Sequence, residues 1–485
     1  MIHFDKMGEK PLEEFANENT KFKMGVGDLK FDFSRNFIDV NDVQNFQKNI
    51  KNEKIFDKID AFFDCNSHIL GYGSVSWHHV FRNIEKANAS IFKKEAAHYL
   101  EDCFELCEKI HTGKILGAED KPIKTVLNIG IGGSDLGVRL GNYALKDDAA
   151  YDIEVYHLNQ PDQFYINNVL DKVDFSETLV VYTSRGFNTL DMLSCLDYVR
   201  TRFESVLGSP DVLKKQFIAV TANEQAAIEH GFAGDRIVKM PAWIGGRYSI
   251  SSPAGFSFIL KLGKKNYLKF LEGMAEIDLS FQDHNLFKNP ALFAAFIEFH
   301  YIKNFSVRAQ AFQVYDNRLW DFCAYYQQLY MESLGKKIPD PKISSNIIFG
   351  GLGIKGQHAY YQTLHEGNQL IPIEFIVKTK IDNVMDKTLF ANAVAQSQAL
   401  MQRNRPMNII TYKRLTPKIL GQLIAYCEHK VFALAQLMNI NPFDQPGVEL
   451  GKAILKEILP IFDDKKKIQK CLGNVTKSFF DLCEK

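Results

Sequence analysis

Two stretches of the chain carry groups that can bind an anion. The first, residues 128–137 (NIGIGGSDLG), follows the apolar run 125–127 and precedes a helical pattern. Glycines let backbone N–H groups approach a ligand, and Ser134 or Asp135 can cap the incoming helix, whose N-terminus is partly positive. Gly133 and Ser134 are therefore candidates for phosphate binding. The alternative is a structural turn that is rich in glycine.

The same loop does not match the common nucleotide-binding motifs. With Gly130 and Gly132 as the first two glycines, G-x-G-x-x-G requires a third at position 135, where the chain has Asp135. The motif G-x-x-x-x-G-K followed by Ser or Thr is also absent from the sequence. A mononucleotide or dinucleotide is therefore not the expected ligand.

The second anion-binding candidate is residues 183–189 (TSRGFNT), which follow the apolar run TLVVY. Hydrogen-bond donors are available there, and an arginine is well suited to phosphate. They come from Ser184, Arg185, Gly186, Asn188 and Thr189. Two such loops at the ends of neighbouring parallel strands would face one crevice. The alternative is a plain helix start capped by Ser or Thr.

Two further segments could move a proton or stabilise charge. Arg247 follows Gly245 and Gly246 directly, so it could offset charge on a developing oxyanion, or it could form a structural salt bridge. Gln328 and Glu332 are four residues apart in a helical pattern and share one face. A partly desolvated carboxylate there would serve as a base, whereas an exposed one would be an ordinary surface residue.

The last candidates lie towards the C-terminus. His358, in GGLGIKGQHAYYQ, could shuttle a proton near neutral pH, although a capping or core histidine is the usual alternative. Lys452 ends the segment NPFDQPGVELGK, which also contains Gln445. A lysine in that position is ordinarily exposed to solvent.

No metal site is expected. Cys103, Cys107 and His111 have helical i, i+4, i+8 spacing, but three ligands that drift around one straight helix do not converge on one ion. The pair His78–His79 has no further ligand nearby in sequence, and we interpret it as a helix-start or surface pair.

The elements that position these residues alternate between strand and helix. A helix is predicted over residues 90–111, followed by short apolar runs at 125–131, 153–158, 178–184, 217–222 and 236–241 with helical segments between them. This alternation predicts a mostly parallel sheet with both faces covered, closed by a helix over 256–273.

A second α/β unit opens with a helix that has Pro290 at its first position. Strands are expected at 309–315, 346–350 and 370–377, and helices at 318–334, from 357, and almost continuously after 386. The first 90 residues show helical patterns and little strand signal.

Composition narrows the class of protein. The 485 residues are 46% hydrophobic and 24% charged, which is typical of soluble globular domains. Lys plus Arg and Asp plus Glu both total 58, so bulk charge does not favour nucleic acid or an anionic membrane. Eight scattered cysteines without a CxxC pair and the lack of a long apolar run predict a cytoplasmic protein.

Together, the segments resemble the signature of the phosphoglucose isomerase family. They are IGIGGSDLG, GGRYS, MES-x-GK, GQH-x-x-YQ and PFDQ-x-GVELGK, and the resemblance runs from about residue 90 to 460. It implies an α/β fold of two doubly wound parallel-sheet SIS (sugar isomerase) domains. The expected small domain is 91–265, inserted in a large domain of 1–90 and 266–485. The resemblance also implies a sugar monophosphate substrate, a homodimer with shared sites, and no metal or organic cofactor.

The resemblance further implies roles for single residues. Glu332 would be the base that moves a proton between C2 and C1 of the sugar, and Arg247 would stabilise the enediolate. His358, from the neighbouring subunit, and Lys452 would serve ring opening. The expected substrate contacts are Gly133, Ser134, Ser184, Arg185, Gly186, Asn188, Thr189, Gly246, Gln328 and Gln445.

The sequence departs from the family pattern around the site. The usual Ser-Lys-Thr-Phe-Thr-Thr loop is SRGFNT here, Leu334 replaces an asparagine, and Pro446 replaces a tryptophan. Two other functions therefore stay open, a sugar-phosphate sensor without catalysis and an isomerase for a different hexose phosphate.

Overall fold

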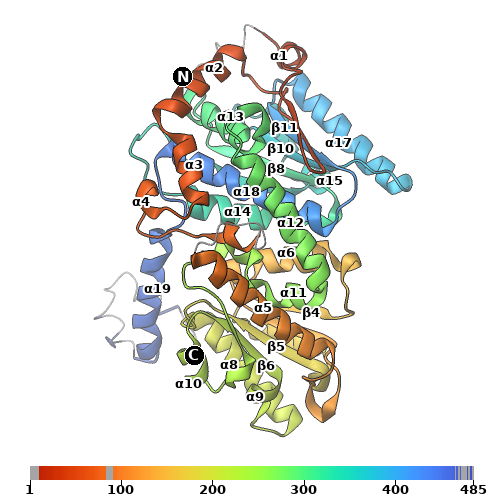
Figure 1. The fold of residues 1–485 in the computed structure, drawn as a ribbon, viewed down its shortest axis with the longest axis vertical. Helices are drawn as coiled ribbons and strands as arrows, with labels where there is room; N and C mark the ends of the chain where they lie inside the picture. The colour runs from red at the N-terminus through yellow and green to blue at the C-terminus, as the bar shows by residue number, and fades with distance from the viewer. Residues whose placement is uncertain are drawn as a thin grey trace. The chain divides into compact units, whose positions relative to one another are not determined.

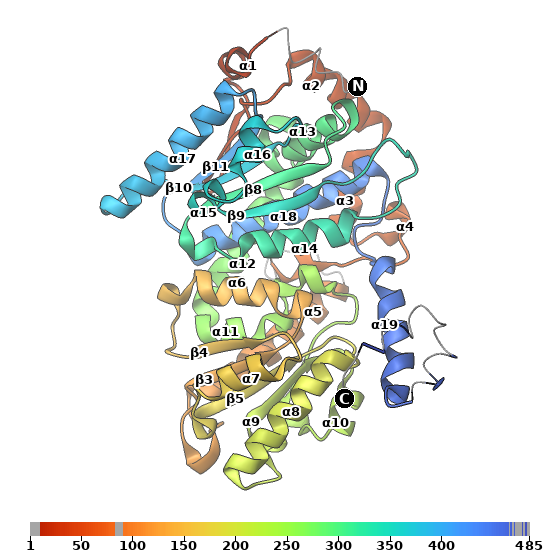
Figure 2. The ribbon, with the colours of Figure 1, turned by 180° about the vertical axis from the view of Figure 1, so that it is seen from behind.

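The structure is a computed structural model that describes residues 10–82 and 91–464, together with residues 466, 467, 470, 478, 481 and 482. The chain divides into two compact units, Met1–Phe443 and Asp444–Lys485. The first unit contains both sheets, and the second contains α19 (Pro446–Ile458) and the short 3-10 helix Leu459–Ile461. Figures 1 and 2 show the arrangement of helices and strands within the first unit.

The smaller sheet has five parallel strands in the order β4-β3-β5-β6-β7. Their bounds are β3 (Thr125–Ile129), β4 (Glu154–Leu158), β5 (Thr178–Thr183), β6 (Phe217–Thr221) and β7 (Ile237–Lys239). Leu179 and Val181 of β5 pack into one apolar cluster, and Val180 and Tyr182 into another. Because both faces are buried, the strand is a continuous apolar run, as predicted.

The larger sheet has six strands in the order β1-β2-β11-β10-β8-β9. Its bounds are β1 (Lys23–Val26), β2 (Leu29–Asp32), β8 (Ala309–Tyr315), β9 (Ile347–Leu352), β10 (Ile373–Lys378) and β11 (Met407–Tyr412). Strands β11, β10, β8 and β9 are parallel, and β2 joins β11 in the antiparallel direction. The fold class predicted from the sequence, α/β with two doubly wound parallel sheets of the SIS type, is confirmed.

Sequence reasoning missed three of these strands. Strands β1 and β2 form an antiparallel hairpin whose turn contains Gly27, at φ +55°. Their alternating burial spans only four residues each, too short for a clear signal. Strand β11 lies where a nearly continuous helical region was expected, because long helices flank it on both sides.

Helices that range from four residues to 22 residues in length surround the sheets. The helices of the first unit are α1 (Leu12–Glu18), α2 (Val40–Asn52), α3 (Ile55–Phe63), α4 (Ser67–Leu70), α5 (Ile91–His111), α6 (Leu136–Ala144), α7 (Gln163–Leu170), α8 (Leu190–Leu207), α9 (Val212–Gln216), α10 (Glu224–Glu229), α11 (Phe256–Leu262), α12 (Lys264–Phe281), α13 (Pro290–Asn304), α14 (Phe322–Leu334), α15 (Gly353–Gln357), α16 (Tyr361–Glu366), α17 (Val384–Gln402) and α18 (Pro417–Met438). Within the described ranges, no helix combines the length and apolar character needed to span a bilayer.

Three of the helices bear on sequence predictions. The expected helix over 256–273 is two helices, because Gly263 at φ +81° separates α11 from α12. Pro290 is the first residue of α13, and the Asn289 side chain accepts the Leu292 N–H, as a helix start requires. The helix expected over 90–111 is α5, although Ser90 itself lies outside the described residues.

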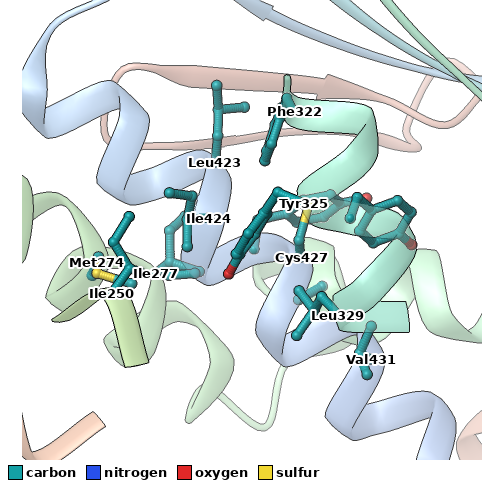
Figure 3. Packing of buried hydrophobic residues seen from close by; sticks show 14 of the residues in the cluster. Ile250, Met274, Ile277, Phe322, Tyr325, Leu329, Leu423, Ile424, Cys427 and Val431 are labelled. Atoms are coloured by element: carbon teal, nitrogen blue, oxygen red, sulfur yellow. The ribbon is translucent and has the colours of Figure 1, made fainter. Parts of the chain in front are cut away.

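The core between the sheets fixes α14. Figure 3 shows Tyr325 and Leu329 of α14 against Cys427 and Val431 of α18. The same helix extends towards the loops of the smaller sheet, since a Cβ atom at Gly132 would lie 2.9 Å from Gln328 Nε2. Gln328 and Glu332 of α14 belong to the site described below.

Candidate active site

The two predicted anion-binding loops end neighbouring strands. β3 and β5 pair in parallel, with Ile129 opposite Tyr182, so residues 130–135 and 183–189 leave the sheet at the same edge. From β3 the chain continues to β4 on one side, whereas from β5 it continues to β6 on the other. This reversal is the topological switch point at which open α/β sheets bind ligands. The expected proximity of the two loops is confirmed.

The first loop is locked to the segment that carries Arg247. A Cβ atom at Gly133 would lie 2.0 Å from the carbonyl carbon of Gly246 and 2.6 Å from the amide nitrogen of Arg247. The Ser249 hydroxyl donates to the Gly133 carbonyl at 3.4 Å and to that of Gly246 at 2.7 Å. Only glycine allows this backbone approach, which places Arg247 beside the anion-binding loop.

The capping role expected for Ser134 or Asp135 is wrong. Asp135 occupies the N-cap position of α6, but its carboxylate accepts hydrogen bonds from His157 Nδ1 at 2.8 Å and Asn159 Nδ2 at 2.9 Å. Arg139 lies 3.4 Å from the same carboxylate. Burial alone would raise the pKa of Asp135, but these partners together hold that pKa below its usual value. Across the described residues, the Ser134 hydroxyl has no protein partner.

In the second loop, Ser184 Oγ and Thr189 Oγ1 lie 3.4 Å apart. Thr189 is the N-cap residue of α8, yet its side chain caps nothing, so the capping alternative does not explain it. Phe187 adopts φ +54°, and its buried ring packs against Tyr182. Because the Phe187 ring is buried there, the backbone turns, and the Ser184 and Thr189 hydroxyls lie near each other at the start of α8.

Arg185 and Asn188, two residues of this loop that differ from the family pattern, are exposed. The Arg185 guanidinium donates to the Ile244 carbonyl at 2.8 Å, which ties the loop to the segment before Arg247. Asn188 is exposed, and Gly186 accommodates its side chain, since a Cβ at Gly186 would lie 3.0 Å from Asn188 Oδ1. Phosphate contacts by Arg185 and Asn188 stay predictions.

Arg247 and Glu332 form the centre of the site. Arg247 Nη1 lies 3.4 Å from Glu332 Oε1, and the Arg247 side chain is 1% exposed against 21% for Glu332. Arg247 Nε donates to Ser333 Oγ at 2.7 Å, and Nη2 donates to the Pro442 carbonyl. The guanidinium is therefore fixed in position, with its charge beside the carboxylate of a partly exposed side chain.

Gln328 lies on the same face of α14, as predicted from its spacing to Glu332. A Cβ at Gly132, which has φ +59°, would approach Gln328 Nε2 to 2.9 Å, so this side chain reaches the first loop. Gln328 Oε1 and Glu332 Oε2 are buried acceptor atoms without a hydrogen-bond partner in the described structure. Two unsatisfied acceptors on one helix face, one of them on the side chain paired with Arg247, are suited to the hydroxyl groups of a sugar.

His358 is not joined to this centre within the chain. It is the C-cap residue of α15 and exposed, and its backbone N–H donates to the Lys355 carbonyl at 3.1 Å. None of the interactions found in the described residues links its imidazole to Glu332 or Arg247. A contribution from a second subunit stays a prediction.

Gln445 and Lys452 belong to the C-terminal unit. Gln445 is the N-cap residue of α19, although its side chain does not cap the helix. Lys452 Nζ lies 3.0 Å from Glu449, and both side chains are exposed. Their roles in the site stay predictions.

Sequence reasoning did not identify the buried residues around Arg247. His78 and His79 begin the 3-10 helix His78–Phe81, as the helix-start alternative predicts, but they are buried and do not form a surface pair. Tyr248 and Ser333 also contribute, as the chain neighbours of Arg247 and Glu332. Adjacency to those residues is the signal that could have identified them.

The described residues show no group of His, Cys, Asp or Glu arranged to hold a metal ion. His111 Nε2 hydrogen-bonds the Leu260 carbonyl at 2.8 Å, and its ring stacks on Tyr151. Cys103 and Cys107 are buried thiols of the α5 core.

Two doubly wound sheets, with hydroxyl-bearing loops at one switch point and a carboxylate beside a fixed arginine, define an enzyme of the sugar-isomerase class. Comparison with known proteins identifies the family. The model of the phosphoglucose isomerase family matches residues 32–404 and 401–479. The chain belongs to this family of aldose-ketose isomerases.

Individual relatives agree. A glucose-6-phosphate isomerase from Ectopseudomonas mendocina is 32% identical, with 92% of this chain and 89% of the relative covered. One from Acinetobacter baumannii is 30% identical, with 99% and 94% covered. The crystal structure of a glucose-6-phosphate isomerase from Chlamydia trachomatis shares the fold at a TM-score of 0.81, with 24% identity and coverage of 95% and 93%.

Proposed function

We propose that this chain interconverts glucose 6-phosphate and fructose 6-phosphate with Glu332 as the base. One observation carries the assignment. Glu332 is the carboxylate beside the buried Arg247, and its Oε2 is a buried acceptor without a hydrogen-bond partner among the described residues. A general base must be within reach of the proton it takes, and this carboxylate belongs to a partly exposed side chain and is held in place.

The reaction moves one proton between two carbons. In the open-chain aldose, Glu332 takes the proton from C2, the C2–H electron pair forms the C1–C2 double bond, and the C1 carbonyl electrons move to O1, which gains a proton to give the cis-enediol. The same carboxylic acid then returns its proton to C1, while the hydroxyl on C2 loses its proton and becomes the ketone, so that the net change on oxygen is one proton moved from O2 to O1. Negative charge develops on oxygen only on the way to the enediol, so Arg247 contributes most in the transition state.

The phosphate group is assigned to the loops after β3 and β5. Ser134, Ser184 and Thr189 supply hydroxyl donors, and the N-terminus of α8 adds a partial positive charge. Backbone amides at Gly133, Gly186 and Gly246, with Arg185 and Asn188, complete the proposed phosphate contacts. Binding energy at the phosphate positions the reacting carbons without contributing to proton transfer itself.

Gln328 and Gln445 are assigned to the sugar hydroxyls, and His358 and Lys452 to ring opening. His358 is exposed, and no interaction among the described residues joins its side chain to Glu332. We therefore assign it to the active site of a second copy of the chain. The neighbouring helix α17 supports a homodimer at this face. Gln357 accepts a hydrogen bond from Asn392 of α17 at 3.1 Å, and α17 exposes Val384 and Met385 at 69% and 75%.

Further expectations accompany this assignment. The small domain is proposed as residues 91–265, and the large domain as 1–90 with 266–485. A cytoplasmic location, and reaction without a metal or organic cofactor, complete the proposal.

A coupled assay tests the function directly. Purified chain is given fructose 6-phosphate, and formation of glucose 6-phosphate is followed with glucose-6-phosphate dehydrogenase. We expect turnover that is unaffected by EDTA. A protein that binds fructose 6-phosphate in a thermal-shift assay but gives no turnover at millimolar substrate would be a sensor. Faster turnover of mannose 6-phosphate would assign a different hexose preference.

A further inference from the structure

Arg247 is held by more than its contact with Glu332. Its three nitrogen atoms point to three partners, namely Ser333 through Nε, Pro442 through Nη2 and Glu332 through Nη1. The Nε contact, at 2.7 Å, is to a side chain that is itself fully buried. The orientation of the guanidinium therefore depends on where Ser333 Oγ is held.

Ser333 has a second partner in Tyr248. The two hydroxyl oxygens lie 2.9 Å apart, and Tyr248 is fully buried. Burial raises the pKa of Tyr248, so its phenol keeps a proton to donate at neutral pH. A serine oxygen accepts two hydrogen bonds, so Ser333 can accept from both Tyr248 and Arg247.

Tyr248 is a rigid anchor for this contact. Its ring is stacked on His78 with centroids 4.6 Å apart and an interplanar angle of 19°. Phe443 packs against the same ring at 5.5 Å. His78 is fixed in turn, because its Nδ1 donates to the Ser76 carbonyl at 2.9 Å. The Ser76 hydroxyl accepts the N–H of Gly245, two residues before Arg247.

We propose that Tyr248 is a positioning residue for isomerisation, and that it acts through Ser333 to hold the Arg247 guanidinium against Glu332. The Arg247 guanidinium carbon also lies 5.4 Å from the centroid of the Tyr248 ring, a contact that the ring makes without its hydroxyl. No interaction among the described residues joins Tyr248 to Glu332 or to the switch-point loops. The proposal rests on the proposed function, because Arg247 is assigned there to the charge of the enediolate.

The test replaces single hydroxyl groups. Tyr248→Phe keeps the ring and its stacking on His78 but removes the donor to Ser333. Because Arg247 acts mainly on the transition state, we expect kcat to fall about 10-fold while KM changes less than about 2-fold. Ser333→Ala should lower kcat further, and the double variant should be no slower than Ser333→Ala alone, since both act through one contact.

Tyr267→Phe is the matched control. Tyr267 is equally buried and donates to the Ile250 carbonyl at 3.2 Å, away from Arg247. It should lose a similar amount of thermal stability and keep the wild-type kcat. In an Arg247→Lys background, which lacks the Nε donor, Tyr248→Phe should change kcat no further.

The outcomes separate the two proposals. A wild-type chain without isomerase activity overturns the proposed function and this one with it. An active wild type with an unchanged kcat in Tyr248→Phe overturns the positioning role alone. The same holds if the kcat losses of Tyr248→Phe and Ser333→Ala multiply, or if Tyr267→Phe loses as much kcat as Tyr248→Phe.

Discussion

Gly133 and Gly246 meet backbone to backbone, so closely that a Cβ on Gly133 would lie 2.0 Å from the carbonyl carbon of Gly246. The contact joins the loop after β3 to the segment that carries Arg247. The loop that we propose to bind phosphate and the arginine that we propose to stabilise charge are thereby held in one fixed geometry. A change at this contact should affect both stability and catalysis.

Gly133→Ala tests the contact. The added methyl group overlaps with backbone atoms that cannot rotate away, so we expect a loss of about 1–3 kcal/mol in unfolding free energy. The value of kcat/KM should fall at least 10-fold, because the loop after β3 and the segment that carries Arg247 would move apart. Gly234→Ala is the control, because a Cβ there meets open space. Equal activity of the two variants would contradict the structural role.

The hydroxyl pair of the second loop should act in binding. Ser184 Oγ and Thr189 Oγ1 are 3.4 Å apart and cap no helix. Ser184→Ala and Thr189→Val each remove one donor to a charged group, so KM should rise about 10-fold with kcat nearly unchanged. Thr201→Val is the control, since its hydroxyl donates to the Asp197 carbonyl on the exposed side of α8. A fall in kcat at constant KM would assign the pair to chemistry instead.

Asp135 should stabilise the fold at neutral pH. Its pKa in the folded chain is below the ordinary value of 3.8, so its contribution is present above that value and disappears as pH falls through the folded pKa. Asp135→Asn should cost about 1–3 kcal/mol at pH 7. Denaturant unfolding of both proteins from pH 7 to pH 3 measures this. The difference between them should shrink in acid, and a constant difference would contradict the assignment.

Glu428 should have the opposite pH dependence. Burial, with repulsion from Asp278, raises its pKa from 4.5 to about 7 despite its ion pair with Arg82. The folded chain therefore binds a proton more tightly than the unfolded chain. Its contribution is full below pH 4.5 and is lost as pH rises through about 7.

Glu428→Gln removes this titration. The stability of wild type relative to the variant should decline between pH 5 and pH 8, by on the order of 3 kcal/mol if the whole shift is expressed. Urea unfolding at each pH gives the measurement. A relative stability that rises over this range would show that the ion pair with Arg82 dominates.

Local sequence was sufficient for the parts of the site that depend on local chemistry. The apolar runs and the glycines after them predicted β3, β5 and both loops, since strand burial and turn conformation follow from neighbouring residues. The spacing of Gln328 and Glu332 predicted their common face on α14 for the same reason.

Contacts between distant segments could not be predicted. Asp135 was expected to cap α6, but His157 and Asn159, brought close by β4, take its carboxylate. His78 and His79 were expected at a helix start or at the surface. They do begin the 3-10 helix His78–Phe81, yet they are buried beside Asp278 of α12 and Glu428 of α18. Such partners become neighbours only when the sheets and helices pack.

The most direct test of the central claim is isomerisation in D2O by wild type and Glu332→Gln. Wild type should produce glucose 6-phosphate and place solvent deuterium at the carbon that receives the proton. The variant should bind substrate with similar affinity and lose turnover and deuterium incorporation together, by about 10²–10⁴-fold. Glu366→Gln, which changes an exposed carboxylate paired with Arg403, is the control and should match wild type. Turnover and deuterium incorporation near the wild-type rate in Glu332→Gln would contradict the role of Glu332 as the base.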